Sequence, residues 1–252
     1  ALDQGSFERL FVSPETPWRF RVTSVVADTS QGSVQLYVAH NHADSAAGCL
    51  SLRVSTLSVD LRASAPPASR DAGSRWVPLY TSQPCLSPDE PIDSYESGGR
   101  LAFTTDGALL LSVGDHGRDG LRAAALSQDT VSPYGKVHRL SLDGTTRVYS
   151  RGHRNVQGIA LSATGEVWSV EHGPQGGDEL NLLRDGANYG WPYDTYGTDY
   201  GHPTWPPAAN RPPDAVFEAP AHAFVPSVAP SALLALRGDR WGAWRGDLII
   251  AT

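Results

Sequence analysis

The chain has 252 residues, of which 40% are hydrophobic and 19% charged, a balance that supports a sizeable core and excludes general disorder. Its formal net charge is −7, which argues against the clustered cations that nucleic-acid binding requires. No run of about 18 or more apolar residues occurs, so no transmembrane helix is predicted. The 25 Gly and 19 Pro indicate a turn-rich fold rather than a helical bundle.

Strand signals recur along the chain, whereas no segment keeps a helical spacing of apolar residues for about three turns. Four apolar strands share one form, which is a glycine turn, then apolar residues, then a small or polar end. They span residues 32–41, 107–116, 165–174 and 246–252. A further strand is predicted over 136–142, where the Asp-Gly pair that follows is typical of a hairpin turn.

This internal repeat of about 70 residues, with loops of variable length, predicts an all-β fold made of β-propeller blades. The apolar strands would be the inner ones, buried on both faces. A β-sandwich, which also has short strands at regular spacing, is the alternative. The chain has no Met and its last strand ends in mid-run. We therefore expect residues 1–252 to form a single partial propeller domain of about four blades, with N-terminal and C-terminal blades incomplete or missing.

The two cysteines, Cys49 and Cys85, would close a loop of about 37 residues if they paired in an oxidising compartment. Two unrelated buried thiols are the alternative, and the sequence leaves the choice open. No Cys/His spacing suggests a zinc site.

The densest polar cluster runs from residue 152 to residue 192. Arg and Asn beside Gly-rich turns, as at Arg154 and Asn155, can hold a planar, anionic ligand that bears carbonyl groups. Backbone carbonyls at a Gly-Pro turn, as at Gly173 and Pro174, suit a hard cation such as calcium when carboxylates are near. The alternative is that these are turn residues that cap blades.

The motifs in and around this cluster occur in a fixed order. They read GGRLAF at 98–103, DG at 106–107, VGD at 113–115, GKV at 135–137, GHRNVQG at 152–158, EHGPQGGDELN at 171–181, NYGWP at 188–192 and PSVAPS at 226–231. As a set they resemble the signature of the soluble pyrroloquinoline-quinone (PQQ)-dependent glucose/sorbosone, or aldose sugar, dehydrogenases. That family includes the hedgehog-interacting-protein-like propellers, and its fold is a six-bladed propeller. Val156 stands where the family usually has Pro.

The resemblance implies roles for particular residues. Arg154 and Asn155 match positions that contact the quinone cofactor. Gly173 and Pro174 match positions whose backbone carbonyls bind the calcium ion against it.

The resemblance further implies a second, structural calcium site at Glu179 and Tyr189. Asp115 matches an acidic residue that supports the catalytic base.

The catalytic base is where this sequence departs from the family. The family has a His four residues before the Arg of the G-R-L motif, and counting back from Arg100 gives Glu96. The reference pKa of Glu is about 4.3 against about 6.5 for His, so a carboxylate is the weaker base near neutrality unless burial raises its pKa. His116 follows Asp115 directly and is expected on the opposite face of a strand, so we do not expect it to substitute.

By resemblance, the protein is a quinoprotein oxidoreductase that oxidises an aldose at C1 with PQQ and calcium and passes electrons to an external acceptor. The alternative is a non-catalytic propeller relative that acts as a binding or scaffold subunit for a protein partner, which Glu96 favours. A calcium-dependent lactonase is a third hypothesis. Enzymatic activity is therefore left open, and we expect a periplasmic or extracellular protein with no nucleic-acid partner and no membrane span.

Overall fold

The computed structural model describes residues 2, 4, 7–8, 20–29, 33–59, 76–87, 89, 92–93, 95–121 and 123–252. These residues divide into two units, 1–89 and 90–252, and each unit is described by itself. The prediction that residues 1–252 form one partial domain therefore stays a prediction. None of the helices in the described ranges is long and apolar enough to cross a membrane.

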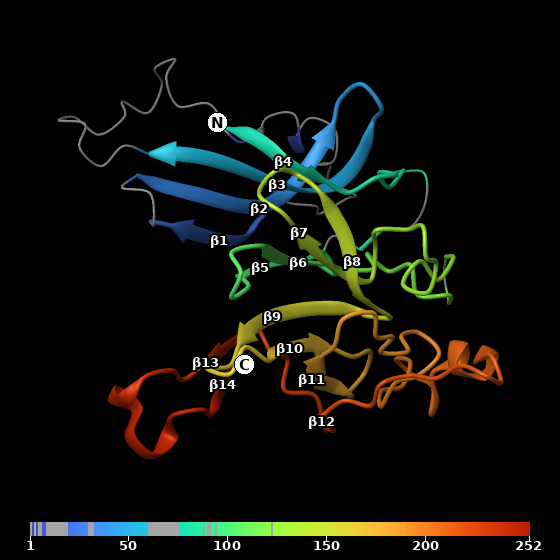
Figure 1. Cartoon of the computed structure of the whole chain (residues 1–252). Coiled ribbons are helices and arrows are strands. Elements are labelled where there is room, and N and C mark those ends of the chain that lie inside the picture. Colours follow the sequence, from blue (N-terminus) through green and yellow to red (C-terminus); the bar gives the residue numbers. More distant parts are fainter. Residues whose placement is uncertain are drawn as a thin grey trace. The chain divides into compact units, whose positions relative to one another are not determined.

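The first unit is built on one four-stranded antiparallel sheet (Figure 1). Its strands follow chain order and are β1 (Val22–Asp28), β2 (Val34–Asp44), β3 (Cys49–Val59) and β4 (Val77–Thr81). Cys49 and Cys85 form a disulfide, which settles the open question of their pairing. Beside the disulfide, Leu50 and Leu86 exchange backbone hydrogen bonds of 2.9 and 2.8 Å. The disulfide and these two bonds together fix the segment after β4 to the start of β3.

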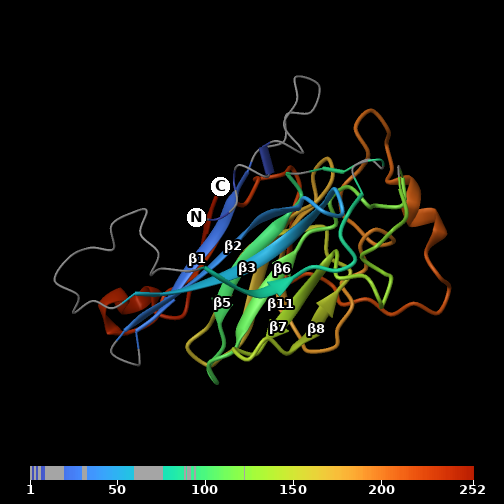
Figure 2. The same cartoon turned by 90° about the horizontal axis from the view of Figure 1, so that it is seen from above.

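The second unit contains two more four-stranded antiparallel sheets and one two-stranded sheet. The first sheet has β5 (Gly98–Phe103), β6 (Leu109–Val113), β7 (Lys136–Leu140) and β8 (Thr146–Arg151), and Figure 2 shows these strands running side by side. The second has β9 (Asn155–Leu161), β10 (Val167–His172), β11 (Asp178–Leu183) and β12 (His222–Phe224). The last pair is β13 (Ala232–Ala235) and β14 (Leu248–Ala251), and two 3₁₀ helices are η1 (Pro206–Asn210) and η2 (Asp239–Trp244).

The repeated apolar segments of the sequence occupy equivalent places in the sheets. They form β2, β6, β10 and β14, each of which is the second strand of its sheet. In β6, which lies between β5 and β7 within its sheet, every residue is buried. The repeat that predicted propeller blades is therefore a repeat of sheets built strand by strand in chain order, as propeller blades are.

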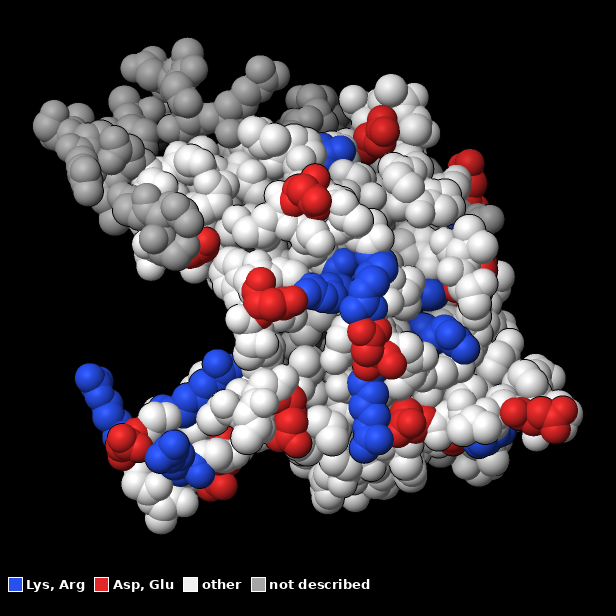
Figure 3. Space-filling view, viewed as in Figure 1, with Lys and Arg blue, Asp and Glu red and all other residues white. Residues whose placement is uncertain are grey.

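Charged side chains on the visible face in Figure 3 lie next to one another with both signs mixed. In the second unit, Arg147 pairs with Asp185 at 2.6 Å through both of its terminal nitrogens, and Arg139 pairs with Asp106. All four side chains are at least partly exposed, so these pairs contribute little to stability.

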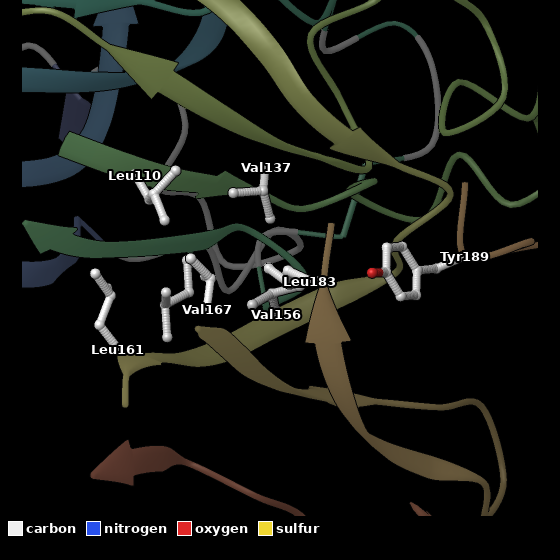
Figure 4. Packing of buried hydrophobic residues seen from close by; sticks show 8 residues of the cluster. Leu110, Val137, Val156, Leu161, Val167, Leu183 and Tyr189 are labelled. Atoms are coloured by element: carbon white, nitrogen blue, oxygen red, sulfur yellow. The ribbon is translucent and has the colours of Figure 1, made fainter. Parts of the chain in front are cut away.

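The main core of the second unit lies between its two four-stranded sheets (Figure 4). It is formed by Leu110, Val137, Val156, Ile159, Leu161, Val167, Leu183 and Tyr189. A smaller cluster of Ala160, Val170 and Leu233 joins the sheet β9–β12 to the pair β13–β14. Both clusters use residues of β9 and β10, so these strands are fixed from two sides and form a rigid support for the turns at their ends.

Candidate active site

The predicted site residues of the second unit lie at one end of its sheets. Glu96 comes just before β5 and Asp115 just after β6, while Arg154 precedes β9 and Gly173 follows β10. Neighbouring strands in each sheet are antiparallel, so the start of one strand adjoins the end of the next.

Backbone hydrogen bonds hold these strand ends together. The Gly114 N–H donates to the carbonyl of Ser97 at 3.0 Å, and the His116 N–H donates to that of Glu96 at 3.2 Å. A Cβ at Gly114 would lie 1.9 Å from the Glu96 carbonyl oxygen, so only glycine allows this approach. The Asp115 N–H donates to the Arg154 carbonyl at 2.9 Å, which joins the two sheets at the same point.

Arg154 is the centre of this arrangement. Its Nη2 pairs with Glu96 Oε1, and its Nη1 donates to the Gly173 carbonyl at 2.8 Å. Its guanidinium also lies 5.5 Å from the centre of the Trp191 ring, within the range of a cation–π contact. The side chains of Arg154 and Glu96 are 16% and 12% exposed, so the ion pair is largely shielded from water yet open on one side.

Glu96 and Asp115 form a buried acidic pair. Burial raises the pKa of Glu96, and the charges of Asp93 and Asp119 add to that effect, while Arg154 and a hydrogen bond with Asp115 lower it. Asp115 is fully buried, and its pKa is raised well above the ordinary value by burial and by the charge of Glu96. Burial thus favours the protonated form of both carboxyls, and the charge of Glu96 favours it further for Asp115.

Trp191 fixes Asp115 from the other side. Its Nε1–H donates to Asp115 Oδ2 at 2.6 Å, while its ring stacks on Trp205 with the ring centres 4.9 Å apart. The same indole therefore touches Asp115 by its edge and Arg154 by its face. The sequence placed Trp191 in the NYGWP motif but did not assign it this role.

Asn155, the second residue expected at the cofactor, is buried and already holds three hydrogen bonds. Its Oδ1 accepts from the Gly98 N–H at 3.1 Å and from the Gln157 amide at 2.6 Å. Its Nδ2 donates to the Tyr95 carbonyl at 3.5 Å, a weak bond that leaves a second N–H on the same nitrogen. Asn155 thus ties β9 to the start of β5 and can offer a ligand one donor.

A hydrogen-bond relay that sequence reasoning missed lies behind Arg154. Glu171 Oε1 accepts from His153 Nδ1–H at 2.8 Å, and Glu171 Oε2 accepts from the Arg154 backbone N–H at 2.8 Å. Because a carboxylate only accepts, His153 donates through Nδ1–H, and its Nε2 is hydrogen-bonded to the Ser150 hydroxyl at 2.8 Å. All three side chains are buried, so the relay fixes the backbone at Arg154 and has no access to a substrate. The sequence signal for this relay was Glu171, a charged residue in the otherwise largely apolar strand 167–172.

The predicted structural-calcium residues lie beside this relay. Glu179 Oε2 and Glu171 Oε1 both accept from the Asn181 amide, at 3.1 and 3.0 Å. Burial and the charge of Glu171 raise the pKa of Glu179 to about 8. The Tyr189 hydroxyl donates to the Leu182 carbonyl at 2.6 Å, so Tyr189 could offer a metal only its backbone oxygen.

The turn that carries Gly173 and Pro174 is anchored by Asp178. Asp178 Oδ1 accepts from the Gly173 N–H at 3.0 Å. Its Oδ2 accepts from the N–H groups of Val228 and Ala229, at 2.9 and 2.8 Å, and from the Ser227 hydroxyl. This buried carboxylate thus fixes the PSVAPS segment, residues 226–231, to the Gly-Pro turn.

The donor chemistry of these residues fits the cofactor and the ion that the sequence implied. Glu96 already places an anionic oxygen on Arg154, as a quinone or carboxylate oxygen of a ligand would be placed. A cavity of about 10 Å³, room for about one small ion or water, is lined in part by Glu171, Glu179 and Asp194. Within the described ranges, no three His, Cys, Asp or Glu side chains converge on one metal position, so an ion there would also need backbone carbonyls.

Comparison with known proteins gives a consistent set of relatives. The sequence model of a family described as Glucose / Sorbosone dehydrogenase matches residues 74–252. Aldose sugar dehydrogenase YliI of Escherichia coli (strain K12) is 32% identical over 168 residues, which cover 61% of this chain and 44% of that protein. Quinoprotein glucose dehydrogenase B of Acinetobacter calcoaceticus is 33% identical over 128 residues, covering 40% of this chain and 27% of that protein.

A solved structure agrees with these sequence relatives. The crystal structure of a glucose dehydrogenase matches with a TM-score of 0.73 at 30% identity, covering 90% of this chain and 64% of that one. The chain thus spans less than half the length of the two sequence relatives and under two thirds of the solved structure. The fold is accordingly a β-propeller, of which this chain covers a part.

Proposed function

Because the chain belongs to the glucose/sorbosone dehydrogenase family, we propose that it forms the part of a PQQ-dependent sugar dehydrogenase that supplies the base and several cofactor contacts. The proposed reaction is oxidation of an aldose at C1, with electrons passed to an external acceptor. The observation that carries this proposal is the convergence of Glu96, Asp115 and Arg154 with the Gly173 carbonyl at one end of the sheets.

Two sets of residues are proposed to hold the cofactor. Arg154 and Asn155 would bind the quinone, the first by charge and the second by its remaining amide N–H. The carbonyls of Gly173 and Pro174 would bind the calcium ion, whose hard character suits oxygen donors. The Gly173 oxygen has two lone pairs, so the bond from Arg154 Nη1 leaves one for the ion. When bound, PQQ supplies the two-electron acceptor, and calcium makes it more electrophilic.

The proton is the part of the reaction assigned to this chain's own side chains. Oxidation of an aldose to a lactone removes a hydride from C1 and a proton from the C1 hydroxyl. Glu96 is proposed to accept that proton, since burial raises its pKa above the ordinary carboxyl value and so makes it a stronger base. Asp115, held by Trp191, would support the base through their shared hydrogen bond.

A structural calcium ion is proposed at Glu179 and the backbone oxygen of Tyr189. The supporting observation is the pair of buried carboxylates, Glu171 and Glu179, whose mutual repulsion a divalent cation would relieve.

A non-catalytic binding subunit is the second candidate function, and one observation favours it. The Arg154 guanidinium is already paired with Glu96 at the position where the family has a His, so the chain's own carboxylate occupies the cation. Such a relative would keep the propeller and bind a protein partner.

An exported location, periplasmic or extracellular, is proposed on the disulfide between Cys49 and Cys85, because such bonds persist in oxidising compartments. The net charge of −7 gives no support to a nucleic-acid partner.

The test is reconstitution of the protein with PQQ and calcium, followed by dye reduction with glucose and other aldoses. We expect turnover that depends on PQQ and falls at least about 100-fold in Glu96→Gln, which keeps the shape but removes the base. Asp185→Asn, which breaks an exposed arginine pair in the same unit, is the matched control and should retain the activity. No bound PQQ and no turnover in the unaltered protein would contradict the enzyme and favour the binding subunit.

A further inference from the structure

The Arg154 guanidinium holds Glu96 at Nη2 and backbone carbonyls at Nη1, the two nitrogens that form one edge of its plane. Nη2 is held by Glu96, Nη1 by the Gly173 carbonyl at 2.8 Å with the His172 carbonyl at 3.5 Å, and one face lies against Trp191. A guanidinium binds oxygens in its own plane through its N–H groups, so a ligand oxygen that takes the place held by Glu96 at Nη2 must displace that carboxylate.

We propose that Glu96 and an anionic ligand exchange on Arg154, so that the ligand takes the place of Glu96 and releases the carboxylate into the site. The inference rests on the proposed function and adds a step to it. Exchange is favoured over simple addition because two anions on one shielded cation repel each other, and the pair is too little exposed for water to screen that repulsion.

The exchange alters the proton affinity of Glu96. The charged and titratable groups that act on Glu96 are Arg154 from the turn before β9, Asp115 after β6, and Asp93 and Asp119 from the adjoining loops. Of these, Arg154 has the largest effect in lowering the pKa of Glu96, and Asp93 and Asp119 raise it. A ligand that takes over Arg154 therefore leaves Glu96 with a greater proton affinity, so arrival of the ligand activates the base.

The geometry also defines the class of ligand. It must present an anionic oxygen to Arg154 and tolerate the backbone carbonyl of Gly173 beside that oxygen. PQQ, an ortho-quinone with carboxylates, belongs to this class. A neutral sugar does not, because it cannot replace a carboxylate on a guanidinium.

The experiment measures binding rather than activity. PQQ is titrated by calorimetry, at saturating calcium, into the unaltered protein, Glu96→Gln and the control Asp185→Asn, after circular dichroism melts have shown that each is folded. We expect the dissociation constant of Glu96→Gln to be lower by at least about tenfold, equivalent to about 1.4 kcal/mol, and that of Asp185→Asn to be unchanged. The side chain of Glu96→Asp keeps the charge but is shorter and reaches Arg154 poorly, so its dissociation constant for PQQ should lie between those of Glu96→Gln and the unaltered protein. If Glu96→Gln does not fold, Glu96→Asp takes its place in the test.

The outcomes separate this inference from the function on which it rests. Equal or weaker PQQ binding by Glu96→Gln overturns the exchange while leaving the proposed dehydrogenase intact. Absence of PQQ binding in all variants overturns both. Tighter binding by Glu96→Gln together with loss of its turnover supports both, since that variant would hold the cofactor without a base.

Discussion

Replacing Asp178 by Ala should release the PSVAPS segment from the Gly-Pro turn. The carboxylate accepts three backbone N–H bonds of 2.8–3.0 Å, from Gly173, Val228 and Ala229, and a fourth bond from the Ser227 hydroxyl. Val228 is half-buried and Ala229 is exposed, so water can replace part of what they lose, and each bond contributes less than is usual for a bond to a charged group. At about 1 kcal/mol for each bond, the free energy of unfolding should fall by about 3–4 kcal/mol.

Two measurements check this prediction. Urea denaturation gives the change in unfolding free energy, and amide hydrogen exchange should show lost protection at Val228 and Ala229. Ser227→Ala is the matched control, because it removes one of the four bonds and should cost about 1 kcal/mol. Unchanged protection of the two amides in Asp178→Ala would refute the assignment of this carboxylate as the anchor.

Three further perturbations test other parts of the chain. Replacing Cys49 and Cys85 by Ser removes a disulfide that closes a loop with a sequence separation of 36, and should lower the free energy of unfolding of the first unit by about 4 kcal/mol. A decrease of less than about 1 kcal/mol would contradict a stabilising role of this disulfide. In calcium-free buffer, the raised pKa of Glu179 stabilises the fold fully below the ordinary pKa of a Glu side chain, and this stability is lost as pH rises through about 8. The free energy of unfolding should change by about 3–5 kcal/mol over that range, and Glu179→Gln should abolish the change whereas Glu166→Gln, at an exposed position, should not. His153→Phe removes one hydrogen bond from buried Glu171 and one from buried Ser150 and should cost about 2–3 kcal/mol in the same assay, and a neutral effect would refute the relay.

The strands and their repetition could be predicted from the amino-acid sequence. Three of the four apolar segments could be identified because they form β2, β6 and β10, which are internal strands, and an internal strand favours an apolar run bounded by turns. The fourth forms β14, which pairs with β13. The ordered motifs at 98–115, 152–192 and 226–231 also indicated the family, since turn residues and polar side chains at strand ends are local features of the chain.

The hydrogen bonds and ion pairs between those residues could not be predicted from the sequence and became known from the folded chain. Glu96 and Arg154 are 58 residues apart, and nothing in either motif predicts that the carboxylate would occupy the guanidinium. The bond from Trp191 to Asp115 and the anchoring of 227–229 by Asp178 likewise depend on packing between segments distant in sequence. Local patterns fix which backbone conformation a segment adopts, whereas the partner of a buried polar group is set by which other segment the core brings within about 3 Å of it.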